Sequence, residues 1–173
     1  VLVLFLGNFR AGLIVSSVIP LSMLFALILM NMLGVSANLM SLGAIDFGIV
    51  VDGAVIIVEG VLHGLHKKHK GKTLTKLQMN NEIKSASGQI YNTAAFGVLI
   101  ILVVFVPIFT LEGIEGKTFL PMAQTVSFAI LGSLILSVTY VPVASALFLN
   151  KKISDKVTFA DKIVIAIQKR YLP

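Results

Sequence analysis

A series of long hydrophobic segments limits the fold of this chain more than any other feature. Four segments are complete and occupy residues 11–33, 35–62, 88–111 and 121–149, and residues 1–7 read as the end of a fifth. Each complete segment is longer than the roughly 20 residues that a helix needs to cross a bilayer. Because a helix satisfies its own backbone hydrogen bonds in lipid, we expect an all-α fold, a polytopic bundle of transmembrane helices.

The composition also indicates a membrane protein. Hydrophobic residues make up 57% of the chain and charged residues only 13%, whereas a soluble domain has about 25% charged residues. The chain has no Cys, which excludes disulfide bonds and thiolate–metal ligation. The sequence has no nucleotide-binding loop and no nucleophile triad, so ATP-driven transport is not indicated. We expect no cofactor, no catalytic residue and no nucleic-acid partner.

The basic residues predict how the chain is oriented. Of the 14 Lys and Arg residues, only Lys117 lies in a connection that falls on the opposite side of the predicted bundle from the others. The rest precede the span 11–33 or lie in the segments 63–87 and 150–173. Since connecting segments rich in Lys and Arg remain in the cytoplasm, we expect loops 63–87 and 150–173 to be cytoplasmic.

The end of the chain predicts an element of a different kind. Residues 151–173 are too short and too charged to form another span, but apolar residues recur there at helical spacing beside Lys and Arg. This pattern is typical of an amphipathic helix at the membrane interface; the alternative is a connecting helix packed on protein. The chain starts within a hydrophobic run and has no initiating Met. We therefore expect a fragment of a larger transporter.

Three acids lie inside the second span, and they are the candidate functional residues. Asp46, Asp52 and Glu59 occur in the stretch 38–60, which holds no basic residue. Acids at membrane depth are costly and mark transport pathways or proton relays. On a helix, Asp52 and Glu59 are about 20° apart around the axis and about 10 Å apart along it, whereas Asp46 is rotated by about 120° from Asp52. We expect Asp52 near the middle of the membrane, with Asp46 on the outer side and Glu59 on the cytoplasmic side.

An acid in apolar surroundings is disfavoured in its charged form, so it can take up and release a proton as its surroundings change. The alternative is a carboxylate held in a permanent ion pair. No Lys or Arg occurs in the four predicted spans, so a cationic partner has to come from outside this sequence. Three such acids on one helix favour transport chemistry.

Other functions were weighed against transport. His63, His66 and His69 have a spacing that suggests a metal site, but the neighbouring lysines repel a divalent cation, and we expect a solvated turn without bound metal. An intramembrane aspartyl protease needs two converging acids, which Asp46 and Asp52 cannot provide from one helix. A non-catalytic subunit of a membrane complex remains an alternative.

The acidic stretch carries a family resemblance. Its sequence, NLMSLGAIDFGIVVDGAVIIVEG, contains the pattern DFG-x-x-VDG-A-x-x-x-VE. This pattern resembles the fourth transmembrane helix of the heavy-metal efflux branch of the resistance-nodulation-division (RND) transporters. The resemblance continues through residues 107–149, which are similar to the fifth-to-sixth helix region of that family. An RND exporter of organic compounds is the alternative, but such pumps carry two adjacent acids at the central position, where this chain has Asp52 followed by Gly53.

The resemblance implies a secondary active transporter, not an enzyme. Members of this branch are proton-driven antiporters of the bacterial inner membrane that need no cofactor, work as homotrimers, and export metal through a periplasmic adaptor and an outer-membrane channel. Asp52 matches the essential proton-relay acid, and Asp46 and Glu59 match the accessory acids. An acid at Asp46 resembles the cobalt-zinc-cadmium type, which implies divalent Co, Zn, Cd or Ni as substrates. Gly60 departs from the family pattern, which usually has Asn there.

Overall fold

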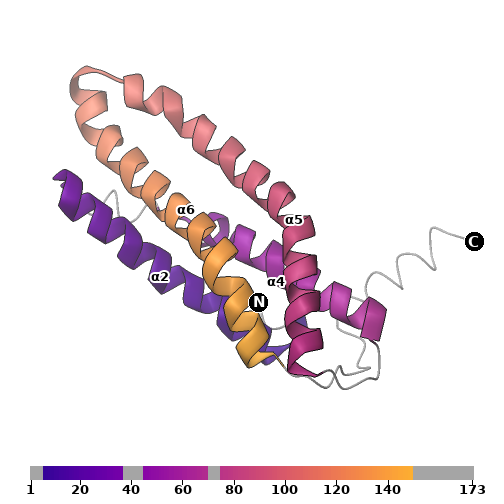
Figure 1. Cartoon of the computed structure of the whole chain (residues 1–173). Helices are drawn as coiled ribbons and strands as arrows, with labels where there is room; N and C mark the ends of the chain where they lie inside the picture. Colours follow the sequence, from indigo (N-terminus) through magenta and orange to yellow (C-terminus); the bar gives the residue numbers. More distant parts are fainter. Residues whose placement is uncertain (1–5, 37–44, 70–74, 150–173) are drawn as a thin grey trace, which may run out of the picture.

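The computed structural model describes residues 6–36, 45–69 and 75–149, and within these ranges it contains helices and no strand (Figure 1). The helices are α2 (Phe9–Leu33), α4 (Phe47–His69), α5 (Lys76–Phe105), the 3₁₀ helix η1 (Val106–Thr110) and α6 (Gly113–Phe148). The predicted all-α class is confirmed. The predicted interfacial helix at 151–173 and most of the segment 1–7 lie outside the described residues.

Four of the described helices are long and apolar enough to cross a membrane. Their candidate spans are Phe9–Leu33, Phe47–His66, Ile90–Thr110 and Gly113–Phe148. The polytopic membrane character predicted from hydropathy is therefore confirmed.

The helix of the second span begins later than predicted. We expected the span to start at residue 35, but α2 ends at Leu33 with Gly34 as its C-cap, whose φ of 68° is left-handed, and α4 begins at Phe47. The Val35 N–H donates to the Met30 carbonyl at 2.9 Å, which closes the end of α2. Hydropathy did not detect this boundary because the residues on both sides of it are apolar.

The connection predicted as a loop at 63–87 is mostly helical. Helix α4 continues to His69, and α5 begins at Lys76. Thr75 and Gln78 form a capping box, in which the Gln78 N–H donates to Thr75 Oγ1 at 3.4 Å and the Thr75 N–H donates to Gln78 Oε1 at 3.1 Å. Six residues separate the two helices: residues 70–74, which the structure does not describe, and the N-cap Thr75.

The third and fourth spans also differ from the predicted bounds. Helix α5 ends at Phe105 and gives way to η1, because Pro107 has no N–H to continue the α-helical ladder. Helix α6 then begins at Gly113, well before the predicted start at residue 121, so that Pro121 lies inside it. Proline is tolerated within membrane helices, where other groups satisfy the freed carbonyl. Pro121 removes the α-helical donor of the Lys117 carbonyl; one turn later, Thr125 Oγ1 donates to the carbonyl of Pro121 itself at 2.7 Å.

Helices α2 and α6 lie side by side and antiparallel along most of their length (Figure 1). Three hydrogen bonds join them at successive levels. They run from Arg10 Nη1 to the Phe148 carbonyl at 3.2 Å, between the Ser17 and Tyr140 hydroxyls at 2.9 Å, and from Thr125 Oγ1 to Met30 Sδ at 3.4 Å. Met30 is thus a buried packing residue, as methionine in an apolar helix usually is.

Gly132 lies at the closest part of this interface. A Cβ atom at position 132 would be 2.6 Å from Cδ1 of Phe25 on α2, closer than real Cβ contacts. Small residues of this kind let membrane helices approach closely, and this approach provides the van der Waals contact that holds them together in lipid. The antiparallel pair therefore depends on the absence of a side chain at Gly132.

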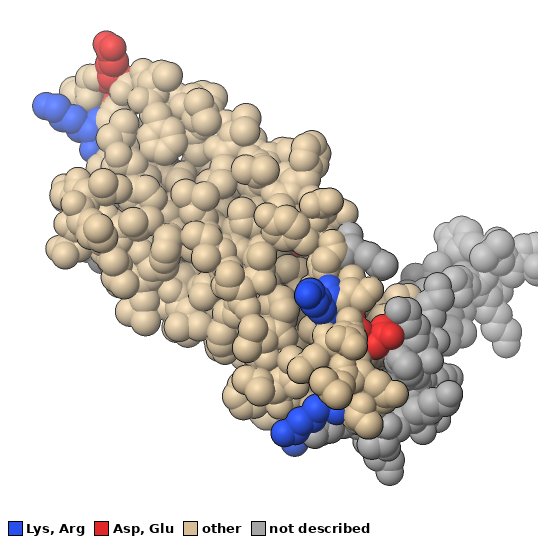
Figure 2. All heavy atoms as spheres, viewed as in Figure 1, with Lys and Arg blue, Asp and Glu red and all other residues tan. Residues whose placement is uncertain are grey.

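The outer surface of the bundle suits a hydrocarbon environment. Large apolar side chains are exposed on every long helix, among them Phe96 at 67% and Leu147 at 73%. On the face shown in Figure 2, Lys, Arg, Asp and Glu side chains lie toward the two ends of the helices, and other residues form the band between them.

We predict that Gly132→Leu weakens the bundle. The new side chain has to displace Phe25 and push α2 away from α6, and overpacking of this kind costs about 1–3 kcal/mol. The measurement is the thermal unfolding midpoint of the purified full-length protein. Gly97→Leu is the matched control, since a Cβ at position 97 meets no atom within 4 Å. Equal midpoints for the two variants would contradict the role given to Gly132.

Candidate functional site

Asp46 is the N-cap of α4, the position just before its first helical residue. Asp46 Oδ1 accepts the Gly48 N–H at 2.7 Å, and the Asp46 carbonyl accepts the Val50 N–H at 3.2 Å. Aspartate is among the preferred residues at this position because its side chain satisfies an N–H that the helix leaves free. The sequence placed Asp46 on the helix itself, whereas it lies at the helix start and is exposed.

Asp52 and Glu59 lie on one exposed face of α4. The exposed residues of that face are alternately four and three positions apart in the sequence. This spacing places them in a single stripe along the helix. They are Asp52, Ile56, Glu59, His63 and His66. The sequence argument found the two acids but not the stripe, although the seven-residue spacing from Asp52 to Glu59 and from Glu59 to His66 was available.

The opposite side of α4 packs against α2, α5 and α6. Its buried residues are Val50, Val51, Gly53, Ala54, Ile57, Val58, Val61 and Leu65. The described part of the chain thus covers the apolar side of α4 and leaves the acidic side uncovered.

The two acids within α4 lie on either side of the middle of its candidate span. In the candidate span Phe47–His66 the midpoint falls at Ile56 and Ile57. Asp52 lies slightly more than one turn before this midpoint and Glu59 less than one turn after it. The depths that we expect for the three acids in the membrane stay predictions.

The acids have no cationic partner within residues 6–36, 45–69 and 75–149, where none of the three forms an ion pair. The same residues contain no group of three or more His, Asp or Glu side chains that could hold a metal ion. His66 Nδ1 lies 2.8 Å from the Leu62 carbonyl of its own helix. The arrangement offers two carboxyl groups on one exposed face of a helix that is long and apolar enough to cross a membrane.

Known proteins match the chain along its whole length. The family model described as AcrB/AcrD/AcrF matches residues 1–173. The chain belongs to this family. The cobalt-zinc-cadmium resistance protein CzcA of Cupriavidus metallidurans is 47% identical over 175 residues, which cover 100% of this chain and 16% of that protein. The nickel-cobalt-cadmium resistance protein NccA of Alcaligenes xylosoxydans xylosoxydans is 43% identical over 170 residues, 97% of this chain and 16% of that protein.

The fold is also that of a solved structure. The crystal structure of a heavy metal efflux pump, crystal form II, superposes with a TM-score of 0.72 at 34% identity, over 99% of this chain and 16% of that one. The predicted resemblance to the heavy-metal efflux branch of the RND transporters is therefore confirmed. The chain spans about one sixth of the length of the relatives it matches.

Gly53 explains how this family member accommodates a single central acid. A Cβ at position 53 would lie 3.3 Å from Ser137 Oγ on α6 and 3.8 Å from Val98 Cγ2 on α5. Helix α4 therefore approaches both neighbours closely beside Asp52. A second acid at position 53 would point into this contact, between a valine and a serine that are both buried.

Gly60 has a similar role one level further along α4. A Cβ at position 60 would collide with the Ile90 side chain of α5, and a Cβ at Gly64 would lie 3.5 Å from that of Ala86. Helix α4 thus makes a close contact with α5 just after Glu59.

Two substitutions of Asp46 separate its capping role from its charge. We predict that Asp46→Ala lowers the free energy of unfolding by about 0.5–2 kcal/mol, because the Gly48 N–H loses its acceptor. Asp46→Asn is the matched control, since an amide oxygen accepts the same hydrogen bond without titrating. The measurement is the stability of the purified full-length protein. Equal losses in both variants would contradict the capping role.

Proposed function

We propose that this chain forms part of the transmembrane region of a proton-driven heavy-metal cation efflux pump, in which Asp52 is the central proton carrier. The observation that carries the proposal is the position of Asp52 and Glu59 on the uncovered face of α4. A carboxylate on such a face needs water, a cation or a proton. Only the last two allow a protein surface to close over it.

The uncovered face of α4 couples the protonation of Asp52 to the packing of other parts of the pump against this helix. With Asp52 charged, closure over α4 requires a cationic partner from the part of the pump beyond this chain. With Asp52 protonated, the charge disappears, and the cation no longer has a partner there. Proton uptake and release therefore favour different packings against α4, which is the differential interaction that a two-state transporter needs. The driving force is the proton motive force, and the mechanism needs no cofactor.

Asp46 and Glu59 have accessory roles in this proposal. Glu59 shares the face of Asp52 and lies nearer to the cytoplasmic end of α4 in the expected orientation. Asp46 lies at the opposite end, at the helix start. The three acids are thus distributed from one side of the span to the other, and a proton that passes through Asp52 meets an acid on each side of it.

The proposed substrates are divalent metal cations, with Co, Zn, Cd or Ni as candidates. The support comes from relatives whose names refer to resistance against cobalt, zinc, cadmium and nickel. We also propose that the complete pump is a homotrimer of the bacterial inner membrane, joined to a periplasmic adaptor and an outer-membrane channel. Segments 63–87 and 150–173 face the cytoplasm in this proposal.

We predict that Asp52→Asn in the full-length pump abolishes metal resistance and metal-coupled proton movement, because the amide cannot carry a proton. Membrane expression should be unchanged, since Asp52 is exposed and Asn has nearly the same size. The measurements are growth in metal-containing medium and metal-dependent proton flux in vesicles. Glu115→Gln, which removes an exposed acid from the first turn of α6, is the control. Full resistance in Asp52→Asn would rule out the relay assignment.

Glu59→Gln should reduce flux without abolishing it, because Asp52 remains able to titrate. The same assay measures this effect. A complete loss in Glu59→Gln together with normal flux in Asp52→Asn would transfer the central role to Glu59.

The orientation is tested by labelling introduced cysteines, since this chain has none of its own. In a full-length pump otherwise free of Cys, Lys117→Cys should react with an impermeant maleimide from the periplasmic side. Lys76→Cys should react only after the inner membrane is broken. The reverse pattern would overturn the proposed orientation.

A further inference from the structure

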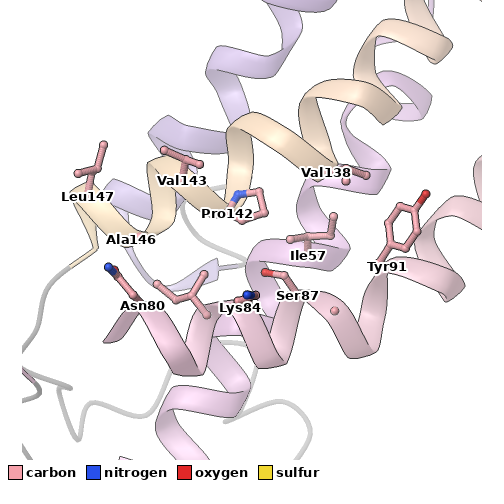
Figure 3. Close-up of a pocket in the computed structure, with 12 residues that line it drawn as sticks. Ile57, Asn80, Lys84, Ser87, Tyr91, Val138, Pro142, Val143, Ala146 and Leu147 are labelled. Atoms are coloured by element: carbon pink, nitrogen blue, oxygen red, sulfur yellow. The ribbon is translucent and has the colours of Figure 1, made fainter. Parts of the chain in front are cut away.

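A pocket of about 540 Å³ lies between the first half of α5 and the second half of α6, on the side of α4 that does not carry the acids (Figure 3). Ile57 of α4 forms its floor. The volume is within the range of about 300–1,000 Å³ that small-molecule sites have in proteins. The pocket is therefore large enough for a ligand and separate from the face described above.

The two walls of the pocket differ in chemistry. The wall from α6 is apolar and consists of Val138, Pro142, Val143, Ala146 and Leu147. The wall from α5 carries a polar stripe at helical spacing, made of Asn80, Lys84, Ser87 and Tyr91. The pocket thus presents hydrocarbon on one side, and hydrogen-bonding groups with one positive charge on the other.

One buried polar atom of the pocket lacks a partner. Ser87 is only 9% exposed, and its Oγ has no hydrogen-bond partner among the described residues. Figure 3 shows this side chain pointing from α5 toward Pro142 and Ile57. A buried polar atom without a partner indicates a ligand or water at the site.

The pocket crosses the boundary of the apolar span. The span of α5 begins at Ile90, so that Asn80 and Lys84 precede it, whereas Tyr91 lies just inside. Tyrosine is enriched at the level of lipid headgroups. Lys84 is about 10 Å from Tyr91 along the helix. A ligand in the pocket would therefore have one end among headgroups and the other in hydrocarbon.

We propose that this pocket binds one anionic phospholipid, with its phosphate at Lys84 and Asn80 and an acyl chain along the apolar wall of α6. Lys84 is exposed and forms no ion pair within the described residues, so its ammonium is available to a phosphate. The hydroxyl of Ser87 is placed to donate to an ester oxygen between headgroup and chain. Each part of the lipid meets the matching part of the pocket.

A phospholipid fits these features better than a soluble anion or a second protein segment. A free phosphate would leave the apolar wall uncovered, and an apolar helix would bury Lys84 and Ser87 without partners, which is costly. The lipid satisfies both walls at the level where its own polar and apolar parts meet. Its binding does not depend on metal transport, so that the proposal stands or falls separately from the proposed function.

The steric test fills the pocket. A Cβ at Gly88, which lines the pocket, meets no atom within 4 Å, so that Gly88→Leu occupies the space without displacing a helix. Gly97→Leu is the matched control on the same helix, since its Cβ also meets nothing within 4 Å and Gly97 is outside the pocket. The full-length pump is purified in mild detergent, and its retained phosphatidylglycerol is counted by native mass spectrometry.

The expected result is one retained phosphatidylglycerol per protomer in the wild type and in Gly97→Leu, and a loss of retained lipid in Gly88→Leu that corresponds to at least about tenfold weaker binding, the equivalent of 1.4 kcal/mol. The proposal is overturned if the wild type retains no lipid, which would mean that another part of the pump fills the pocket. It is equally overturned if Gly88→Leu and Gly97→Leu retain the same amount.

The charge test leaves the packing intact and remains decisive if Gly88→Leu does not fold. Lys84→Gln should weaken phosphatidylglycerol binding about fivefold, the contribution of one basic residue near an anionic headgroup. Lys76→Gln, at the start of the same helix, should have no effect, and phosphatidylcholine should bind both variants alike. Equal losses of phosphatidylglycerol binding in Lys84→Gln and Lys76→Gln would mean that the lipid is attracted by the overall positive charge. Displacement of the lipid by inorganic phosphate would mean that the pocket binds soluble anions. Either result overturns the proposal.

Discussion

The close approach of α4 to its two neighbours determines where the acids lie. Gly53 brings α4 against Ser137 and Val98, and Gly60 brings it against Ile90. Once this side of the helix is fixed, the 100° rotation per residue leaves Asp52 no place within the described bundle. The uncovered acids are therefore a consequence of packing on the opposite side of the same helix. A side chain added at Gly53 would change the orientation of Asp52 without touching it.

The same contact accounts for the glycine that follows Asp52 in this chain. A helix that packs tightly through position 53 can carry an acid at position 52 but has no room for one beside it. Two adjacent acids would require α4 to move away from Ser137 or to rotate. The single central acid and the glycine after it are therefore one structural feature, in which the close helix contact limits the number of titratable groups at this level.

Hydropathy predicted the number of spans, because a span depends only on a long run of apolar residues. The helical repeat predicted the face shared by Asp52 and Glu59, because these residues are seven apart. Hydropathy did not predict where α4 begins, because apolar residues continue on both sides of Gly34, and hydrogen bonds at Gly34 and Asp46 set the boundaries. The residue types of the Thr75–Gln78 capping box were present in the sequence and could have indicated that a helix begins at residue 76, within the basic segment 63–87. The pocket was not predictable, since it depends on how far α5 and α6 diverge.

Helix α4 separates two environments of different chemistry. Ile56 lies on the acidic face, and the next residue, Ile57, forms the floor of the pocket between α5 and α6. The acidic face carries carboxyl groups, whereas the pocket has an apolar wall from α6 and a polar stripe with one positive charge from α5. Rotation of α4 alone cannot exchange the two, because Gly53 and Gly60 hold its packed side against α5 and α6. The orientation of Asp52 and that of Ile57 are therefore fixed together by the close contacts of α4 with α5 and α6.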